Sequence, residues 1–413
     1  MAIPTKKEIM SFSPMNTGEK ENLPNYKRNA FAEIKKAIQT NLITAVTGLR
    51  RVGKTTLIKQ VLGRNAFYFS FDEKKYANTE ALKQVIEVFL EEKEKPTIFL
   101  DEIFRVEDWA GVLKKYHDQK KVKFVVSGSS SLLIRKGVES LSGRLSTHYL
   151  PPLQFNEYLE MIGKKHETSN NIFKIKRYEE ELNQFLKKGS FPEITKFNDK
   201  DAQEYIRSST IEKIVFDDIP NTFKIEHPSK LYDLMKLCAT NSSRLFTEVN
   251  LAEAVQLSRH AVSDYLLYLE KAYLTTTIYP QGSFQKALKK EKKILVKTAS
   301  IYNALAENPN AWQAAETAVY DKLSLEKLAF YRDAQQREVD FIQNTTPIEV
   351  KYQSTITRVD ANNLLYYLNK YKKTKGVIIT KNLFDEKKIN GKTIIYIPLD
   401  TFLLIKPQTL NLL

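Results

Sequence analysis

Eight residues near the N-terminus, Gly48 to Thr55 (GLRRVGKT), constrain the fold of this chain more than any other segment. The apolar run Leu42 to Val46 precedes them, and a stretch with helical spacing, Lys54 to about Gly63, follows. A glycine-containing loop between a buried strand and a helix presents successive backbone N–H groups and a helix N-terminus to phosphate oxygens. This segment therefore predicts a parallel α/β sheet with a phosphate-binding loop at the end of one strand.

Each position of the loop has a chemical reason. Gly48 and Gly53 allow the backbone to bend around phosphate groups. The ammonium of Lys54 would reach the β- and γ-phosphates of ATP, and the hydroxyl of Thr55 would ligate Mg²⁺. Thr56 follows directly and is counted with the nucleotide-binding positions. The expected cofactors are ATP and Mg²⁺.

A second segment supplies the carboxylates that such a site needs. The run Thr97 to Leu100 predicts a buried strand, and Asp101 and Glu102 follow it directly. Asp101 would hold Mg²⁺ through water, and Glu102 would act as the general base on the attacking water. An isolated Asp-Glu pair can also be a solvated strand end. Its position after an apolar strand, downstream of a phosphate-binding loop, favours the catalytic interpretation.

Two further polar positions are candidates for the same site. The strand Lys123 to Val126 ends in a serine-rich segment, and Ser129 is our choice there for a residue that senses the γ-phosphate. Arg144 could stabilise negative charge in the transition state, although an arginine in such a segment can equally be an ordinary surface residue. Action in trans would require a homo-oligomer such as a ring or dimer, and action in cis is equally consistent with the sequence.

These motifs resemble a widespread group of bacterial and archaeal AAA-type ATPases whose C-terminal domain has no assigned function. Two positions depart from the pattern of that group: Phe104 stands where glutamine is usual, and the segment Lys297 to Ser300 lacks an aspartate two residues before a glycine. The resemblance covers about residues 26–380. The matching segments are TGLRRVGKTTL, FLDEI with Trp109 after it, SGSSSLLI, LSGR, Leu153 to Tyr158, Gly189 to Glu193, Tyr265 to Glu270, Glu338 to Phe341 and Ile348 to Lys351.

The resemblance and the alternation of short apolar runs with helical stretches lead to an α/β architecture in four parts. Residues 1–25 would be a loose polar arm, and residues 26–152 an AAA-type P-loop domain with a parallel sheet. Residues 153–285 would form a helical and winged-helix domain. Residues 286–413 would form a nuclease-like α/β domain.

The middle of the chain has the pattern of a helix-turn-helix. One helix is expected within Phe246 to Leu257 and a second from Ser258 to Tyr265. Arg259, His260 and Ser263 would face outward from the second helix, where such modules touch DNA. Helix-turn-helix units in ATPases can also serve only to pack domains together, so the fold does not by itself establish DNA contact.

An extended segment after Tyr273 would form the wing of this module, with a turn at residues 280–283. A basic run follows at Lys286, Lys289, Lys290, Lys292 and Lys293.

Near the C-terminus, two expected strands carry acidic residues in a pattern that resembles the restriction-endonuclease-like superfamily. A hairpin of Glu338 to Ile342 and Pro347 to Lys351 would let Asp340 and Glu349 face one Mg²⁺, with Lys351 on the same strand face as Glu349. Glu316, on the preceding helix, would match the additional acidic ligand of those folds. An alternating hairpin with ordinary exposed charges gives the same pattern, and such domains can also bind DNA without cutting it.

The charge balance bears on the partner. The chain has 64 Lys and Arg against 49 Asp and Glu, a formal charge of +15. That excess favours DNA, including branched or single-stranded forms, but a lysine-rich solvated surface would give the same number. We therefore expect an ATPase that couples hydrolysis to DNA binding or remodelling, with metal-dependent DNA cleavage left open. The alternative function is an ATP-dependent switch that acts on a protein partner and has an inactive nuclease-like domain.

The remaining composition narrows the class of protein. Cys238 is the only cysteine, so the chain contains no internal disulfide and no thiolate zinc cluster. The N-terminus lacks a signal-like apolar stretch, and no run approaches the length of a membrane span. We expect a cytoplasmic protein that does not cross a membrane.

Overall fold

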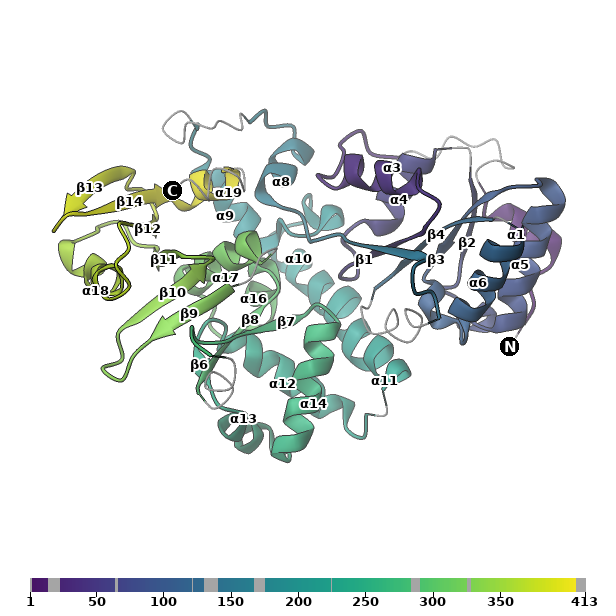
Figure 1. Ribbon diagram of the computed structural model, residues 1–413. Coiled ribbons are helices and arrows are strands. Elements are labelled where there is room, and N and C mark those ends of the chain that lie inside the picture. The colour runs from purple at the N-terminus through teal and green to yellow at the C-terminus, as the bar shows by residue number, and fades with distance from the viewer. Residues whose placement is uncertain are drawn as a thin grey trace. The chain divides into compact units, whose positions relative to one another are not determined.

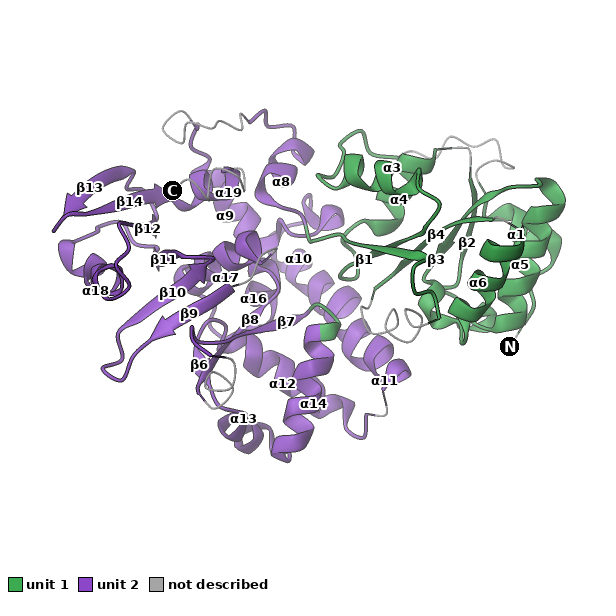
Figure 2. Cartoon of the chain, viewed as in Figure 1, with its two compact units in different colours: residues 1–152, 271–273 green, residues 153–270, 274–413 purple. Residues whose placement is uncertain are grey.

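The computed structural model describes residues 2–13, 23–63, 66–120, 122–129, 140–166, 175–223, 225–283, 290–324 and 328–405. The chain divides into two compact units (Figure 2). Unit 1 consists of Met1–Pro152 with Lys271–Tyr273, and unit 2 of Leu153–Glu270 with Leu274–Leu413.

Unit 1 is built on a five-stranded sheet whose order is β2-β3-β4-β1-β5 (Figure 1). Every neighbouring pair is parallel. The strands are β1 (Ile43–Thr47), β2 (Phe67–Ser70), β3 (Thr97–Asp101), β4 (Lys123–Gly128) and β5 (Leu145–Tyr149). This parallel sheet confirms the predicted α/β fold, and β1, the strand that precedes the phosphate-binding loop, lies between β4 and β5. The apolar runs that indicated the strands are the reason, since β1 is buried at every residue.

Helices accompany this sheet in alternation with its strands: α3 (Phe31–Ile38), α4 (Lys54–Leu62), α5 (Thr79–Glu92), α6 (Trp109–Lys120) and the 3₁₀ turns η1 (Lys74–Tyr76) and η2 (Ile103–Arg105). Each buries an apolar face. The Asn78 side chain caps α5 by accepting a hydrogen bond from the Ala81 amide at 2.9 Å. Aromatic and aliphatic side chains of β2, β3 and α5 fill the core between them.

The prediction of a loose arm over residues 1–25 is wrong for the described residues 2–13. Lys6–Ser11 forms helix α1, which begins with a capping box between Thr5 and Glu8. Ile9 is fully buried in the core of unit 1, and Glu8 accepts a hydrogen bond from the Tyr76 hydroxyl at 2.9 Å. Residues 2–13 are therefore part of the folded domain, because the buried Ile9 side chain and the capping box fix this short helix.

Unit 2 begins with helices and continues into a small antiparallel sheet, whose strand order is β6-β8-β7. The helical elements are α8 (Phe155–Met161), α9 (Glu179–Lys188), η4 (Pro192–Ile194), α10 (Asp199–Tyr205), the π-helical turns η5 (Ile206–Glu212) and η6 (Ile214–Asp218), α11 (Ile219–Thr222), α12 (Pro228–Thr240), α13 (Glu248–Val255) and α14 (Arg259–Lys271). The strands are β6 (Leu245–Phe246), β7 (Thr275–Ile278) and β8 (Lys292–Val296).

The structure differs from the expected domain boundary at residue 285. β8 lies beyond that position, yet it is the central strand of the small sheet and pairs with both β6 and β7. The residues on both sides of 285 also belong to one compact unit. The sequence of β8 does not indicate that it pairs with the earlier strands β6 and β7. The boundary predicted from the sequence therefore falls too early in the chain.

The remainder of unit 2 is a six-stranded mixed sheet of order β13-β14-β12-β11-β10-β9. β11 and β12 pair in parallel, as do β12 and β14, and the other pairs are antiparallel. Leucines of α18 pack on one face of this sheet. The elements are α16 (Ala299–Leu305), α17 (Ala311–Leu323), β9 (Leu328–Arg332), β10 (Glu338–Gln343), β11 (Thr346–Lys351), η7 (Arg358–Ala361), α18 (Asn362–Lys370), β12 (Lys375–Thr380), β13 (Asp385–Ile389), β14 (Lys392–Pro398) and α19 (Leu399–Leu404).

Among the residues that the structure describes, no helix is both long enough and apolar enough to cross a membrane.

Candidate nucleotide-binding site

The loop between β1 and α4 has the backbone shape that its glycines predict. Gly53 is left-handed, at φ +90°, and forms the N-cap of α4. Gly48 has φ +151°, and a side chain there would collide with the carbonyl oxygen of Leu150. Both positions require glycine, since an L-residue would meet strain at one and a steric clash at the other.

Lys54 lies inside the loop that it is predicted to serve. Its side chain is buried, and its ammonium donates hydrogen bonds to the carbonyl oxygens of Gly48 and Leu49, both at 3.0 Å. Arg28, which the sequence did not single out, braces the loop from outside by donating to the carbonyls of Val52 and Pro151 at 2.5 and 2.7 Å. No local motif marks Arg28, because its partners are distant in the chain.

The structure brings Thr55 and Asp101 together. The Thr55 hydroxyl donates to Asp101 Oδ2 at 2.7 Å, and the Ser127 hydroxyl donates to Asp101 Oδ1. Tyr68 also reaches Asp101 Oδ2, at 3.3 Å. A hydroxyl and a carboxylate in contact beside a phosphate-binding loop are the oxygen donors that an ATP-bound Mg²⁺ requires. The residues present therefore fit the expected metal.

Glu102 is positioned by its backbone and by Ser129. Its φ of +50° is left-handed, which turns the chain sharply at the end of β3. The Ser129 hydroxyl donates to Glu102 Oε2 at 3.3 Å, and Ser129 itself is buried. Because β4 lies between β1 and β3, its end stands between the phosphate loop and the two carboxylates. Residues 130 and 131 of the serine-rich segment lie outside the described residues.

Phe104, which replaces the usual glutamine of the resembling group, has an apolar role. Its ring is buried, lies 5.0 Å from the ring of Trp109, and occupies the space that a side chain at Gly128 would need. The substitution thus extends the core beneath β4.

Arg144 lies at the edge of the sheet opposite the phosphate loop. It directly precedes β5, whose first residue, Leu145, pairs with Ile43 at the start of β1. The loop follows the other end of β1, about 16 Å away at the rise of an extended strand. The guanidinium of Arg144 pairs instead with Asp118 at 2.7 Å. Arg144 therefore does not reach the ATP site of its own chain, and action in trans stays a prediction.

The three residues expected to touch DNA are exposed on α14, but two of them have acidic partners. Arg259 pairs with Glu248 at 3.1 Å, and His260 lies 3.2 Å from Asp264. Ser263 is exposed beside them.

The basic run that follows is only partly available for phosphate contacts. Lys292 pairs with Glu248 at 2.7 Å, and Lys293 is buried. Lys286 and Lys289 lie outside the described residues. Lys290 is exposed.

The carboxylates expected to bind a second Mg²⁺ are brought together in unit 2. The β10–β11 register pairs Phe341 with Ile348, so one further step places Asp340 beside Glu349. Lys351 pairs with Glu349 at 2.7 Å. The cluster also contains Lys293, whose ammonium lies 3.2 Å from Asp340 and 3.7 Å from Glu316.

These charges perturb one another strongly. Burial, and then the charge of Asp340, raises the pKa of Glu316 and brings the pKa of Glu349 to about 8. Burial would lower the pKa of Lys293, but the surrounding carboxylates outweigh it and raise that pKa. Burial alone would raise the pKa of Asp340, but the positive charges of Lys293 and Lys351 hold that pKa below its ordinary value.

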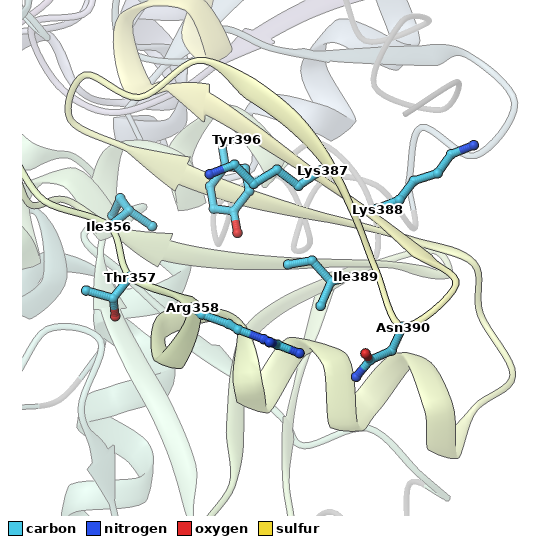
Figure 3. Close-up of a pocket in the computed structure, with 8 residues that line it drawn as sticks. All are labelled: Ile356, Thr357, Arg358, Lys387, Lys388, Ile389, Asn390 and Tyr396. Atoms are coloured by element: carbon cyan, nitrogen blue, oxygen red, sulfur yellow. The ribbon is translucent and has the colours of Figure 1, made fainter.

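A pocket that the sequence did not predict lies in unit 2 between η7 and the β13–β14 hairpin, with a volume of about 370 Å³. Figure 3 shows Lys387 lying over Tyr396 and the Arg358 side chain extending toward Asn390, whereas Lys388 points away. A cationic rim over an aromatic floor can receive an anion. Lys387 also pairs with Asp385 at 3.3 Å, which weakens that role.

Three family models match successive parts of the chain. Residues 40–159 match a model described as an AAA domain. Residues 179–311 and 310–402 match two models, each described as a domain of unknown function (DUF8612 and DUF4143). Residues 40–159 therefore form an AAA-type ATPase-like domain, most of it in unit 1, and the two domains that follow have no assigned function.

Two uncharacterized proteins of Methanocaldococcus jannaschii are similar over most of the chain. One is 27% identical over 87% of this chain and 84% of its own length, the other 25% identical over 76% and 75%. Among solved structures, the Holliday junction branch migration motor RuvB of Thermotoga maritima aligns over 68% of this chain and 92% of its own. The identity is 16% and the TM-score 0.30, too low a score to indicate a shared overall arrangement.

Proposed function

We propose that this protein binds ATP with Mg²⁺ and hydrolyses it. The observation that carries the proposal is the contact between Thr55 and Asp101 at 2.7 Å, with Glu102 immediately beyond. The loop segment and the end of β3 supply these groups, and the end of β4 adds Ser129. All three segments meet at the edge of a parallel sheet formed by the strand ends, where such folds bind ligands.

The residues divide the work by chemistry. When ATP binds, the ammonium of Lys54 would exchange its hydrogen bonds to the loop carbonyls for hydrogen bonds to the β- and γ-phosphates. Thr55 and Asp101 would hold the metal that neutralises phosphate charge. Glu102 would take a proton from the water that attacks the γ-phosphorus, while the bond to the ADP oxygen breaks. Ser129 would orient Glu102, or release it when the γ-phosphate is present.

Replacement of Lys54 tests nucleotide binding. Lys54→Ala removes a charged donor to the phosphates, so ATP affinity should fall by about 100-fold. Lys36→Ala, at an exposed position on α3, is the control and should bind like the wild type. Titration of both with a fluorescent ATP analogue measures the effect. Equal affinity in the two variants would remove Lys54 from the site.

We further propose that hydrolysis is coupled to DNA. The order α12, β6, α13, α14, β7, β8, with β8 between β6 and β7, is the order of elements in winged-helix modules, and this supports the proposal. The exposed residues Arg259, His260 and Ser263 and the net charge of +15 point the same way.

A switch that acts on a protein partner is the second candidate. Two features of the helices α13 and α14 favour it: their exposed apolar side chains and their excess of acidic residues. Leu267 and Val249 are also exposed there, at 47% each, which suits an apolar contact better than a phosphate backbone. Residues 248–271 contain two basic residues, Arg259 and Lys271, against four acidic ones, Glu248, Glu253, Asp264 and Glu270.

One experiment separates the two candidates. The ATPase rate is measured with duplex, single-stranded and four-way-junction DNA over a range of salt concentrations. Stimulation that weakens with salt and is reduced in Arg259→Ala supports the DNA proposal. Absence of both stimulation and salt-sensitive binding for every DNA form would refute it and leave the protein-partner switch.

Metal-dependent DNA cleavage, which the sequence left open, is not included in the proposed function. It requires a divalent cation among Glu316, Asp340 and Glu349, and the ammonium of Lys293 lies among these carboxylates. No group of three or more His, Cys, Asp or Glu residues in the described parts of the chain has a metal-holding arrangement. The residues present do not fit the second Mg²⁺.

A further inference from the structure

We propose that Lys293 is a built-in cation that takes the place of a divalent metal in the nuclease-like core of unit 2. Its side chain comes from β8, the central strand of the small sheet, and is 2% exposed. It reaches carboxylates from two other elements: Glu316 of α17 at 3.7 Å, Glu338 of β10 at 2.6 Å and Asp340 of β10 at 3.2 Å.

The surrounding carboxylates depend on this ammonium for their charge balance. Glu316 is fully buried, and no hydrogen-bond donor reaches either of its carboxylate oxygens among the described residues. Asp340 Oδ2 accepts a hydrogen bond from the Val350 amide at 2.9 Å, which leaves Oδ1 for Lys293. Buried carboxylates without a cation are strongly unfavourable. Lys293 therefore supplies in the fold what a metal supplies in a cation-dependent site.

An ammonium at this position also excludes a divalent ion. A metal such as Mg²⁺ or Mn²⁺ would need the oxygens of Asp340 and Glu316 at about 2.1 Å. It would then lie close to the fixed positive charge of Lys293, and the two cations would repel each other at short range in a buried site. Lys351, paired with Glu349, adds a second positive charge on the other side of the cluster.

The consequence is a core that keeps a nuclease-like arrangement without metal-dependent cleavage. The elements α17, β9, β10, β11, α18 and β12 keep their order around the cluster, so the domain can present a binding surface while its carboxylates are used structurally. This inference concerns unit 2 alone and does not depend on ATP hydrolysis by unit 1.

The test is a gain of metal binding. Lys293→Met keeps the approximate length of the side chain and removes its charge. It is made in an Asp101→Asn background, so that the ATP site loses its carboxylate ligand for a metal. Binding of Mn²⁺ without nucleotide is followed by the loss of the free-ion electron paramagnetic resonance signal. We expect Lys293→Met to bind Mn²⁺ about ten-fold or more tightly than its parent, because the released carboxylates gain by pairing with a cation.

Lys297→Met is the matched control. Lys297 is also buried, and its ammonium pairs with Asp321 at 3.3 Å and donates a hydrogen bond to the Ser324 hydroxyl at 3.0 Å. It should gain no Mn²⁺ binding, and Lys293→Arg, which keeps the charge, should gain none.

Two results would overturn the inference. One is a folded Lys293→Met protein that binds Mn²⁺ no better than its parent. The other needs no Lys293 variant: saturable Mn²⁺ binding by the parent, or Mg²⁺-dependent DNA nicking by the wild type, that disappears in Asp340→Asn. The second readout decides the question even if Lys293→Met fails to fold.

Discussion

At the scale of single residues, the ATP site is a chain of hydroxyl-to-carboxylate contacts. Thr55 and Ser127 both donate to Asp101, and Ser129 donates to Glu102. The two carboxylates are thus held by separate hydroxyl donors, and we propose the first as the metal ligand and the second as the base for water. The sequence could predict the residue types because loop and strand-end motifs are local. It could not predict that the Ser127 hydroxyl donates a hydrogen bond to Asp101, because that contact follows from β4 lying beside β3.

The contact between Ser129 and Glu102 leads to a kinetic prediction. Ser129→Ala removes one hydroxyl donor from the carboxylate of Glu102, the proposed general base, and leaves Lys54 and Thr55 unchanged. The turnover number for ATP should fall about three- to ten-fold, with KM unchanged. Steady-state kinetics measure both. A change confined to KM would indicate that Ser129 contacts bound nucleotide and does not orient Glu102.

At the scale of elements, local sequence signals differ greatly in strength. β1, β3 and β4 are continuous apolar runs and were predicted within a residue or two. β5 was not predicted, because its sequence, LSTHY, is polar and only partly buried. α1 was missed for another reason: six residues are too few for a helical period to be recognised.

Helix α1 can be tested through its one buried apolar side chain. Ile9→Ala leaves a cavity against the core of unit 1 and should lower the free energy of unfolding by about 2–4 kcal/mol. Ile3, 59% exposed in the same segment, provides the control, and Ile3→Ala should have little effect. Urea unfolding compares the two. Equal stability would mean that residues 2–13 do not pack on the domain.

Helix α17 carries a partly buried lysine, Lys322, that makes stability depend on pH. Burial lowers the pKa of Lys322 from 10.5 to about 8, and its ammonium donates to the Leu403 carbonyl at 3.0 Å. Between these values the unfolded chain binds more protons than the folded one, so the stability contributed by this group rises with pH and is constant below about 8.

The corresponding measurement is urea unfolding of the wild type and Lys322→Met from pH 7 to pH 10. The stability of the wild type should gain on that of the variant as pH rises, by at most about 3 kcal/mol. Lys388→Met, at an exposed position, should follow the wild type throughout. Parallel curves for wild type and Lys322→Met would show that Lys322 titrates normally.

At the scale of the whole molecule, the sequence indicated the catalytic half better than the C-terminal half. The P-loop fold follows from two local motifs and the strands that carry them. The proposed role of Lys293 depends on a long-range contact between β8 and the hairpin of β10 and β11. The sequence does not show that contact, so Lys293 was interpreted there as part of a basic run next to a predicted DNA-binding module. Arg144 is the reverse case: the strand register of β5 excluded a role in its own ATP site that the motif had left open.

The measurement that tests the central claim most directly is ATP turnover by the wild type and Glu102→Gln, with ATP binding measured on both. Loss of the general base should leave ATP binding intact and reduce the hydrolysis rate by about 100-fold or more. Glu107→Gln, outside the site, should hydrolyse ATP like the wild type. Wild-type turnover in Glu102→Gln, or no hydrolysis by a wild type that binds ATP, would contradict the account.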